Sequence, residues 1–242
     1  MRVTRVFVGE PLAAGRSSTL EGTAANHVMR VLRLREGDAL TLFDGRGGEY
    51  AARVSGFTKS SVQVEVGEHR PVERESSLHL TLAQGISRGE RMDWVMQKAT
   101  ELGVTRIIPV ITERTMVKLD ERQSERKLQH WRGIVIAACE QSGRNRVPEV
   151  AEPTAYYDVI RSFEPSTTRV LLSPAGTLRA RDLPPSGHIA MLIGPEGGLS
   201  ENEQEAAIAA GFLQVRMGPR ILRTETAAIA ALAALQHDFG DI

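Results

Sequence analysis

The sequence predicts an α/β protein in which a small β-rich module precedes a parallel sheet covered by helices. Residues 1–70 carry short runs in which apolar and polar residues alternate, which is the period of a half-buried strand. A polar segment with a proline, His69–Ser77, follows and is the expected linker. From residue 78 onward, short apolar runs alternate with segments of helical periodicity, which favours a parallel sheet. We therefore expect two domains, residues 1–72 and residues 73–242.

The first module is expected to hold three strands, a helix and a tight turn. Val62–Val66 alternates strictly, and Ala39–Phe43 is an apolar run that ends at the pair Asp44-Gly45. This pair is typical of a hairpin turn because glycine adopts a positive φ readily, so Glu49–Val54 is the expected returning strand. Ala24–Leu34 has the pattern of a short helix. Together these elements predict a small β-barrel-like module.

The second domain is expected to alternate strands and helices along its length. Its helices are predicted from apolar residues spaced three and four apart, and the capping box Ser200–Glu203 marks one helix start. The expected strands are Leu78–Ala83, Arg106–Ile111, Arg169–Leu172, Ile189–Ile193 and Gln214–Met217. The expected helices are Arg88–Gly103, Ser124–Ser142, Ser200–Gly211 and Thr224–His237. In open α/β sheets, ligands bind at the carboxyl ends of the strands.

Composition excludes several classes of protein. The 242 residues include 30 Lys and Arg, 30 Asp and Glu, and a single cysteine, Cys139. One thiol makes no internal disulfide, and no histidine pair has the spacing of a zinc helix, so no metal site is expected. The longest run of small and apolar residues, Ala227–Leu235, is far shorter than the ~20 residues that span a bilayer. Met1–Glu10 has no apolar leader, so we expect a cytoplasmic protein with no membrane partner.

Three loops rich in glycine and proline follow predicted strands late in the chain: Leu172–Gly176, Ile193–Ser200 and Met217–Arg223. Glycine lets backbone amides approach a ligand, and the second loop leads into a helix N-terminus, which favours anionic groups. The fingerprints of P-loop nucleotidases, dinucleotide-binding folds and serine hydrolases are absent from the sequence. From the residues alone, the loops predict a small ligand on a backbone-rich site, or three ordinary tight turns.

Five segments of the chain resemble one family. They are HVMRVLRLREGD (27–38), KATELGV (98–104), CEQSGRNRVP (139–148), IGPEGGLS (193–200) and MGPRILRTETA (217–227). In this combination, order and spacing the sequence resembles the RsmE family, which are 16S rRNA uridine-N3 methyltransferases of the SPOUT superfamily. The resemblance runs over the whole chain.

The resemblance implies a fold and a cofactor. It implies a PUA-like N-terminal β-barrel that binds RNA, followed by a SPOUT α/β-knot domain whose C-terminal part forms a trefoil knot. It also implies a homodimer that acts on 16S rRNA of the small ribosomal subunit and holds S-adenosylmethionine in the three loops. The cofactor-binding residues implied by motif match are Leu172, Ser173, Gly194, Pro195, Glu196, Gly197, Met217, Gly218, Ile221, Leu222, Arg223 and Thr226.

Some of these residues have expected roles. Leu172, Ile221 and Leu222 would pack on the adenine ring, as apolar walls do in ligand pockets. Glu196 would either lie near the positive end of the cofactor or cap its own turn.

Arg223 and Glu225 are the implied catalytic residues. Uridine N3 must lose a proton, and a nearby cation favours the resulting anion, which is the role expected of Arg223. Glu225 would orient Arg223 or accept the proton. The alternative is a structural Arg–Glu pair at the start of the last helix.

Arginines in two regions are the candidates for RNA contact, because their guanidinium groups match phosphate geometry. The expected RNA-binding residues are Arg2, Arg5, His27, Arg30, Arg33, Arg35 and Arg144. Arg144 shares a turn with Gln141 and Asn145. These three residues would either contact RNA or the ligand of a partner subunit, or form a solvated helix end. A second basic stretch from Arg114 to Lys127, which includes Lys118, is expected to be a solvated helix face.

Two other functions remain open at this point. One is a non-enzymatic RNA-binding factor in ribosome assembly that keeps the fold. The other is a related SPOUT methyltransferase that acts on tRNA or on a ribose hydroxyl. The methylated product distinguishes them, since N3-methyluridine and a ribose methyl are different nucleosides.

Overall fold

The computed structural model describes residues 4–116 and 120–242. The chain forms two compact units, one made of Met1–Glu75 with Cys139–Val147 and the other of Ser76–Ala138 with Pro148–Ile242. The units divide three residues beyond the expected boundary between 72 and 73, and the first also gains a segment that is distant in sequence. The expected division stays our proposal for the domains.

The first unit is built on a five-stranded sheet. Its strands are β1 (Arg5–Phe7), β2 (Ser17–Leu20), β3 (Ala39–Phe43), β4 (Glu49–Phe57) and β5 (Val62–Arg70). They lie in the order β1-β3-β4-β5-β2, and only β1 and β3 run parallel. In the described part of the chain β1 and β2 do not pair with each other, so the expected barrel is an open half-barrel.

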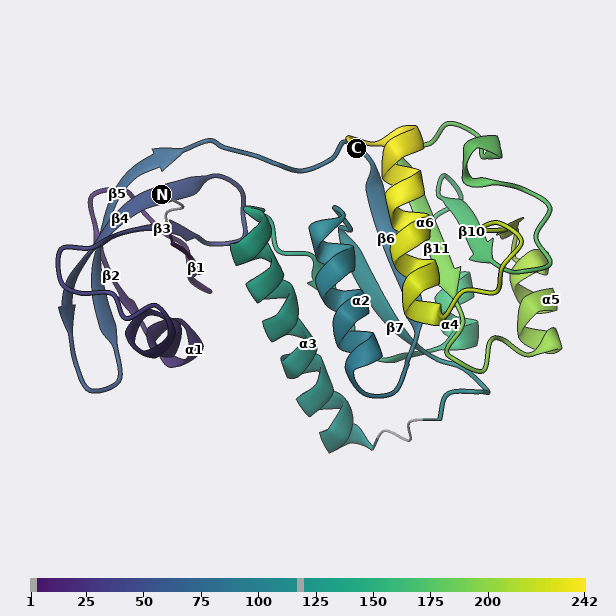
Figure 1. Ribbon diagram of the computed structural model, residues 1–242, viewed down its shortest axis with the longest axis horizontal. Helices are drawn as coiled ribbons and strands as arrows, with labels where there is room; N and C mark the ends of the chain where they lie inside the picture. Colours follow the sequence, from purple (N-terminus) through teal and green to yellow (C-terminus); the bar gives the residue numbers. More distant parts are fainter. Residues whose placement is uncertain (1–3, 117–119) are drawn as a thin grey trace. The chain divides into compact units, whose positions relative to one another are not determined.

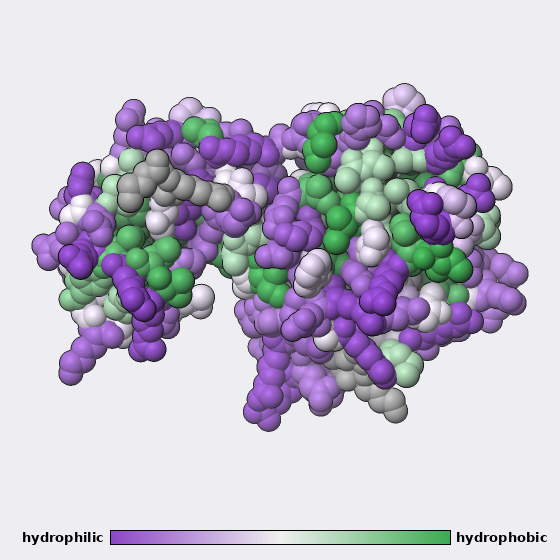
Figure 2. Space-filling view, viewed as in Figure 1, coloured by the Kyte–Doolittle hydropathy of each residue, from purple (hydrophilic) through white to green (hydrophobic). Residues whose placement is uncertain are grey.

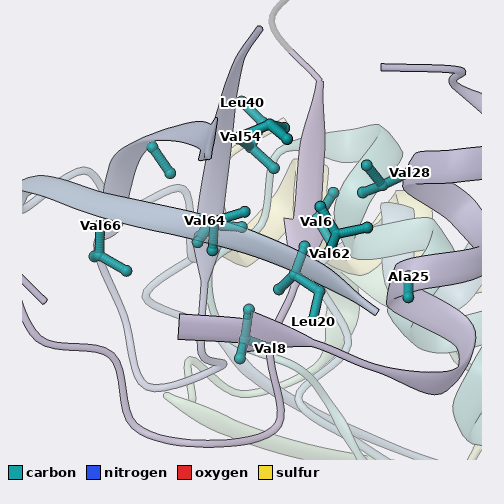
Figure 3. Packing of buried hydrophobic residues seen from close by; sticks show 12 residues of the cluster. Val6, Val8, Leu20, Ala25, Val28, Leu40, Val54, Val62, Val64 and Val66 are labelled. Carbon is teal, nitrogen blue, oxygen red and sulfur yellow. The ribbon is translucent and has the colours of Figure 1, made fainter. Parts of the chain in front are cut away.

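Apolar side chains on the inner face of this sheet form the core of the first unit. The alternation in Val62, Val64 and Val66 buries all three, while the residues between them are exposed. Figure 3 shows these valines gathered with Val6 and Leu20 from the edge strands. The period-two pattern in the sequence therefore marks the buried face correctly.

The helix expected over residues 24–34 begins earlier and changes type. It consists of α1 (Gly22–Asn26) and a π-helical turn, η1 (His27–Val31). Arg33 ends the turn with a φ of 53°, and it is the only non-glycine residue with a positive φ in residues 4–116 and 120–242. A left-handed backbone at an arginine is strained, so this turn carries a local cost.

The second unit contains a parallel sheet. Its strands are β6 (His79–Gly85), β7 (Arg106–Ile111), β8 (Glu149–Val150), β9 (Thr154–Ala155), β10 (Thr168–Leu172), β11 (His188–Ile193) and β12 (Leu213–Val215). Their order is β12-β10-β11-β6-β7-β8, with β9 also on β7, and every pair is parallel. The continuous apolar run of β11 is almost wholly buried, as expected of a strand covered on both faces.

Helices cover both faces of this sheet. They are α2 (Glu90–Glu101), α3 (Glu121–Ser142), α4 (Tyr156–Arg161), α5 (Glu201–Ala209) and α6 (Thr224–Phe239), with a 3-10 turn, η2 (Ala180–Asp182). Figure 1 shows α2 and α6 side by side over one face, and α4 and α5 pack on the other. The last residues of α3 belong to the first unit.

This topology brings three loops together. β12, β10 and β11 are neighbours and run in the same direction, so their carboxyl ends lie at one edge of the sheet. The loops that follow these strands are the three glycine- and proline-rich segments of the sequence. A site formed by all three requires this strand order, which places β10 between β11 and β12.

Candidate functional site: a cavity between three loops

A cavity of about 510 Å³ lies at this edge of the sheet. Its lining includes residues of all three loops, together with Arg91 from α2 and Ala227 from α6. Every residue expected to bind the cofactor lines it except Thr226, which is exposed on α6 and does not line the cavity. The helical turn points Ala227 toward the cavity and Thr226 away, because adjacent residues on a helix face different directions. Thr226 is therefore the one predicted cofactor residue that lies outside the cavity lining.

Buried hydrogen bonds fix the loop after β11. The Thr224 hydroxyl donates to the Gly194 carbonyl at 2.7 Å and accepts from the Gln84 amide at 2.9 Å. Both side chains are buried. Neither residue is among the predicted site residues: Thr224 lies inside the motif of residues 217–227 without an assigned role, and Gln84 is a polar residue in a buried strand, which has no distinctive local signal. They tie the start of α6 and the end of β6 to the cavity loop.

Close backbone packing also holds this loop in place. A Cβ at Gly85 would meet the backbone nitrogen of Pro195 and lie 2.8 Å from the carbonyl carbon of Gly194. Real Cβ atoms do not approach backbone this closely, so glycine is needed where β6 ends. On the outer side, the Arg114 guanidinium donates to the Gly197 carbonyl at 2.9 Å. Arg114 lies before α3 and holds this loop, so its expected place on a solvated helix face is wrong. Lys118, from the same basic stretch, lies outside the described residues.

Arg91 links two carboxylates at the cavity wall. Its Nη1 lies 2.9 Å from Glu196 Oε1, and its Nε lies 3.9 Å from Glu225 Oε1. The backbone N–H of Arg88 also donates to Glu196 Oε1 at 2.9 Å. Glu196 thus reaches the start of α2 and also bonds its own backbone N–H, while it lines the cavity. Sequence analysis missed Arg91, because it is distant from every recognised motif.

The environment keeps Glu196 ionised at neutral pH. Burial of Glu196 would raise its pKa, but hydrogen bonds from the Arg88 N–H and the Arg91 guanidinium outweigh this effect and hold the pKa below its ordinary value. A cation in the first turn of a helix is disfavoured by the helix dipole, and Arg91 occupies that position in α2. Pairing with two carboxylates offsets this cost and leaves the cluster with a net negative charge.

Glu225 and Arg223 do not pair with each other. Among the ion pairs of residues 4–116 and 120–242, Glu225 pairs with Arg91 and Arg223 has no partner. Glu225 is mostly buried, and its Oε2 has no hydrogen-bond partner. Arg223 is exposed, lines the cavity and precedes the first helical residue of α6. The structural Arg–Glu pair is therefore not formed, and both groups remain available to a ligand.

The third loop offers backbone groups to a ligand. At its start, Arg216 N–H donates to Leu178 O at 2.9 Å, and at its end the Arg223 carbonyl accepts from Ala227 N at 2.8 Å. Between these two residues the chain makes no backbone hydrogen bond to any other described residue. Residues 218–221 are exposed, so their backbone groups are open to a ligand, and the loop is suited to bind a polar heterocycle along its edge. Leu172 and Leu222 supply apolar walls at the same place.

Two of the expected RNA-binding arginines are buried inside the first unit. Arg5 lies 2.5 Å from Glu49 and donates to Asn145 at 2.5 Å. Arg144 is only 4% exposed and forms a two-pronged ion pair with Glu75. These guanidinium groups are not presented to RNA phosphates, so the expectation was wrong for Arg5 and Arg144. A sequence cannot show that distant carboxylates meet these particular arginines.

The remaining RNA candidates lie on one segment. Arg30, Arg33 and Arg35 are exposed around the π-helical turn, with Val31 72% exposed between them. His27 is half-buried, 3.6 Å from Glu140. Arg2 lies outside the described residues. The surface formed by Arg30, Arg33 and Arg35 stays our candidate RNA surface on the first unit.

Across residues 4–116 and 120–242 no three histidine, cysteine, aspartate or glutamate side chains gather closely enough to hold a metal ion. None of the helices in the same residues is long and apolar enough to cross a bilayer. Cys139 is buried, and desolvation raises its pKa to about 12, so its thiol is not a nucleophile at neutral pH.

Comparisons with known proteins agree with this geometry. Residues 74–236 match an RNA methyltransferase domain, and residues 20–67 match an RNA methyltransferase PUA domain. The chain is 33% identical over 242 residues to ribosomal RNA small subunit methyltransferase E of Buchnera aphidicola, covering 100% of this chain and 98% of that protein. It is 36% identical over 225 residues to the enzyme of the same name from Synechocystis, and the match covers 90% of this chain and 72% of that protein.

Solved structures give the same result. Ribosomal RNA small subunit methyltransferase E from Neisseria gonorrhoeae, bound to S-adenosylmethionine, superposes with a TM-score of 0.93 at 40% identity over 100% of both chains. The Lpg2936 protein of Legionella pneumophila, solved with S-adenosylmethionine, gives 0.97 at 42% identity over 100% of both chains. The chain therefore belongs to the family of ribosomal RNA small subunit methyltransferase E, in which a PUA-like half-barrel is followed along the chain by an α/β methyltransferase domain.

Proposed function

We propose that this protein transfers the methyl group of S-adenosylmethionine to N3 of a uridine in 16S rRNA of the small ribosomal subunit. One observation carries the proposal: the cavity joins all three glycine- and proline-rich loops, two of which lie in family motifs, at one sheet edge, with unpaired backbone groups and apolar walls. Relatives at 40% and 42% identity hold S-adenosylmethionine. A cytoplasmic location belongs to the same proposal.

The residues of the cavity fit such a cofactor. Its sulfonium supplies an activated methyl group when it is bound. Leu172 and Leu222 would contact the adenine ring, and the backbone of Met217–Leu222 would bond its polar edge. Glu196, Arg91 and Glu225 also line the cavity and form a cluster with a net negative charge, which suits a cationic ligand. Each of these contacts positions the ligand, and positioning is the main contribution that a methyl transfer needs from a protein.

Arg223 and Glu225 are the proposed catalytic pair for the proton of uridine N3. Arg223 has no ion-pair partner in the described chain, so its charge is available to favour an anion at N3. Glu225 has one unpaired, buried carboxylate oxygen that could accept the proton. Arg91 orients Glu225 from the opposite side.

A homodimer belongs to the proposal as well. The outward side of α6 carries the half-buried residues Ile229, Ala230, Ala233 and Ala234. Figure 2 shows pale green, apolar surface over the region of α6, where a surface helix is ordinarily polar. Contiguous apolar surface of this kind favours association, and a second copy is the occupant we propose.

The test is a transfer reaction with a defined product. Small ribosomal subunits from a bacterium that lacks its own methyltransferase of this family would be incubated with the protein and labelled S-adenosylmethionine. Digestion of the RNA to nucleosides and mass spectrometry should give N3-methyluridine from 16S rRNA. A ribose methyl or transfer to tRNA would instead identify a different SPOUT activity, and no transfer despite tight RNA binding would identify an assembly factor.

A further inference from the structure

Three arginines surround the mouth of the cavity on a single loop. Arg216, Arg220 and Arg223 are exposed, and all three line the cavity. In the part of the chain that the structure describes, none of the three side chains makes an ion pair or hydrogen bond. We call residues Arg216–Arg223 the mouth loop. Unpaired cations this close together repel one another, so an anionic partner would relieve the repulsion.

The mouth loop is held at both ends and free between them. Arg216 N donates to Leu178 O, and Ser173 N donates to Val215 O at 3.0 Å, which anchors the beginning of the loop. Arg223 begins α6 at the other end. The arginine side chains therefore project from a backbone fixed at its ends, which lowers the entropic cost of binding.

An apolar side chain lies among these charges. Ile221 is 86% exposed, the largest exposure among the large apolar residues of the described chain. It lines the cavity, and its packing on adenine stays a prediction, while its high exposure leaves most of its surface for a further contact. An exposed isoleucine between arginines suits a ligand with both phosphates and flat apolar faces, which is the chemistry of a nucleic acid.

The proposed reaction itself requires such a contact. N3 of uridine is on the edge that pairs with another base, so it is reached only when the base is unpaired and turned out of its stack. Enzymes and architectural proteins that open a stack often insert an apolar side chain into the gap. Ile221 lies close enough to the cavity to fill the space next to a base that has turned into it.

We propose that the mouth loop grips the RNA strand at the target nucleotide. Arg216 and Arg220 bind the phosphates that flank the target uridine, and Ile221 packs against the neighbouring base. The proposal rests on the proposed function and adds a second RNA-binding surface, on the methyltransferase domain.

The test compares two double variants that remove the same charge. One is Arg216→Ala with Arg220→Ala; the control is Arg161→Ala with Arg181→Ala, which removes two exposed arginines that do not line the cavity. Binding to small ribosomal subunits would be measured across a range of salt concentrations. Loss of two phosphate contacts should lower the slope of log K against log salt by about 2, and the control should keep the wild-type slope. Equal slopes for the two variants would overturn the proposal.

Calorimetry with S-adenosylmethionine is run on both double variants, because Arg216 and Arg220 line the cofactor cavity and loss of the cofactor must be told apart from loss of an RNA contact. If Arg216→Ala with Arg220→Ala no longer binds S-adenosylmethionine, the single variants Arg216→Gln and Arg220→Gln are tested instead. Each should change the salt slope by about 1. Ile221→Ala should raise KM for the subunits and Ile221→Leu should restore it, whereas an unchanged KM in Ile221→Ala rules out the packing role. If wild-type protein transfers no methyl group, the proposed function fails, and the slopes still report on the mouth loop.

Discussion

Individual side chains decide the charge of the cavity wall. Arg91 is paired with Glu196 at 2.9 Å and lies near Glu225, although it occupies the first turn of α2, where a cation is disfavoured. Gly89, with a φ of 58°, allows the turn that places Arg91 there. The side chain therefore serves the cavity at a cost to the helix start, which is typical of a functional position.

Replacing Arg91 by alanine should lower stability in a pH-dependent way. The pKa of Glu196 is held below its ordinary value, so the ion pair stabilises the fold at neutral pH and is lost as pH falls through that pKa. The difference in free energy of unfolding between wild type and Arg91→Ala should be small at pH 7, about 0.2–1 kcal/mol for a partly exposed pair, and should close as the pH falls through the lowered pKa of Glu196. A difference in melting temperature that stays constant as the pH falls would contradict this.

Arg223→Ala should slow the chemical step while the cofactor still binds. Removing a cation that stabilises a developing anion costs roughly 10²–10³-fold in kcat, and lysine should restore part of it. Single-turnover rates with small subunits, beside calorimetry with S-adenosylmethionine, separate the two effects. Wild-type kcat in Arg223→Ala would remove this residue from the catalytic role.

Local elements were predictable wherever one periodicity dominated. The strands of the parallel sheet and the capping box at Ser200 lie where the sequence indicates, because burial on two faces leaves continuous apolar runs. The short strands β1, β2, β8 and β9 and the helix α4 were missed, since two to six residues are too few to establish a period. The π-helical turn η1 replaces the end of an expected α-helix; such single turns are rare, so helical spacing over residues 24–34 predicts an α-helix instead.

The π-helical turn yields a prediction that separates stability from RNA binding. Arg33 has a left-handed backbone and an exposed side chain. Arg33→Gly should stabilise the protein by about 1 kcal/mol, because glycine adopts this conformation without strain. It should also weaken binding to small subunits and lower the salt slope by about 1. Thermal melts and salt titrations check both signs, with Arg53→Gly as a strand control; a melting temperature that falls in Arg33→Gly would refute the strain argument.

The whole molecule combines predictable and unpredictable parts of the site. The three loops were visible in the sequence as glycine- and proline-rich segments, but their meeting depends on a strand order that no local pattern contains. The partners that fix the cavity come from other elements: Gln84 from β6, Arg91 from α2 and Arg114 from the loop after β7. The burial of Arg144 against Glu75 likewise follows from long-range packing. The trefoil knot and the dimer stay predictions of the family resemblance.

The dimer can be tested through the apolar side of α6. Ala233 is half-buried on this helix, and a glutamate there would place a charge in the proposed interface. Sedimentation should give a dimer for wild type and a monomer for Ala233→Glu, with His237→Glu, exposed on the same helix, as the control. A wild-type protein that sediments as a monomer at micromolar concentration would exclude the proposed homodimer.

The most direct test of the account is calorimetric titration with S-adenosylmethionine of wild type and two neighbouring variants. Ala227 lines the cavity, and Thr226 beside it is exposed and does not. We predict one site per chain for wild type and Thr226→Phe, and no binding for Ala227→Phe, whose ring would fill the cavity. Equal binding by all three proteins, with melting temperatures near wild type, would contradict the assignment of this cavity to the cofactor.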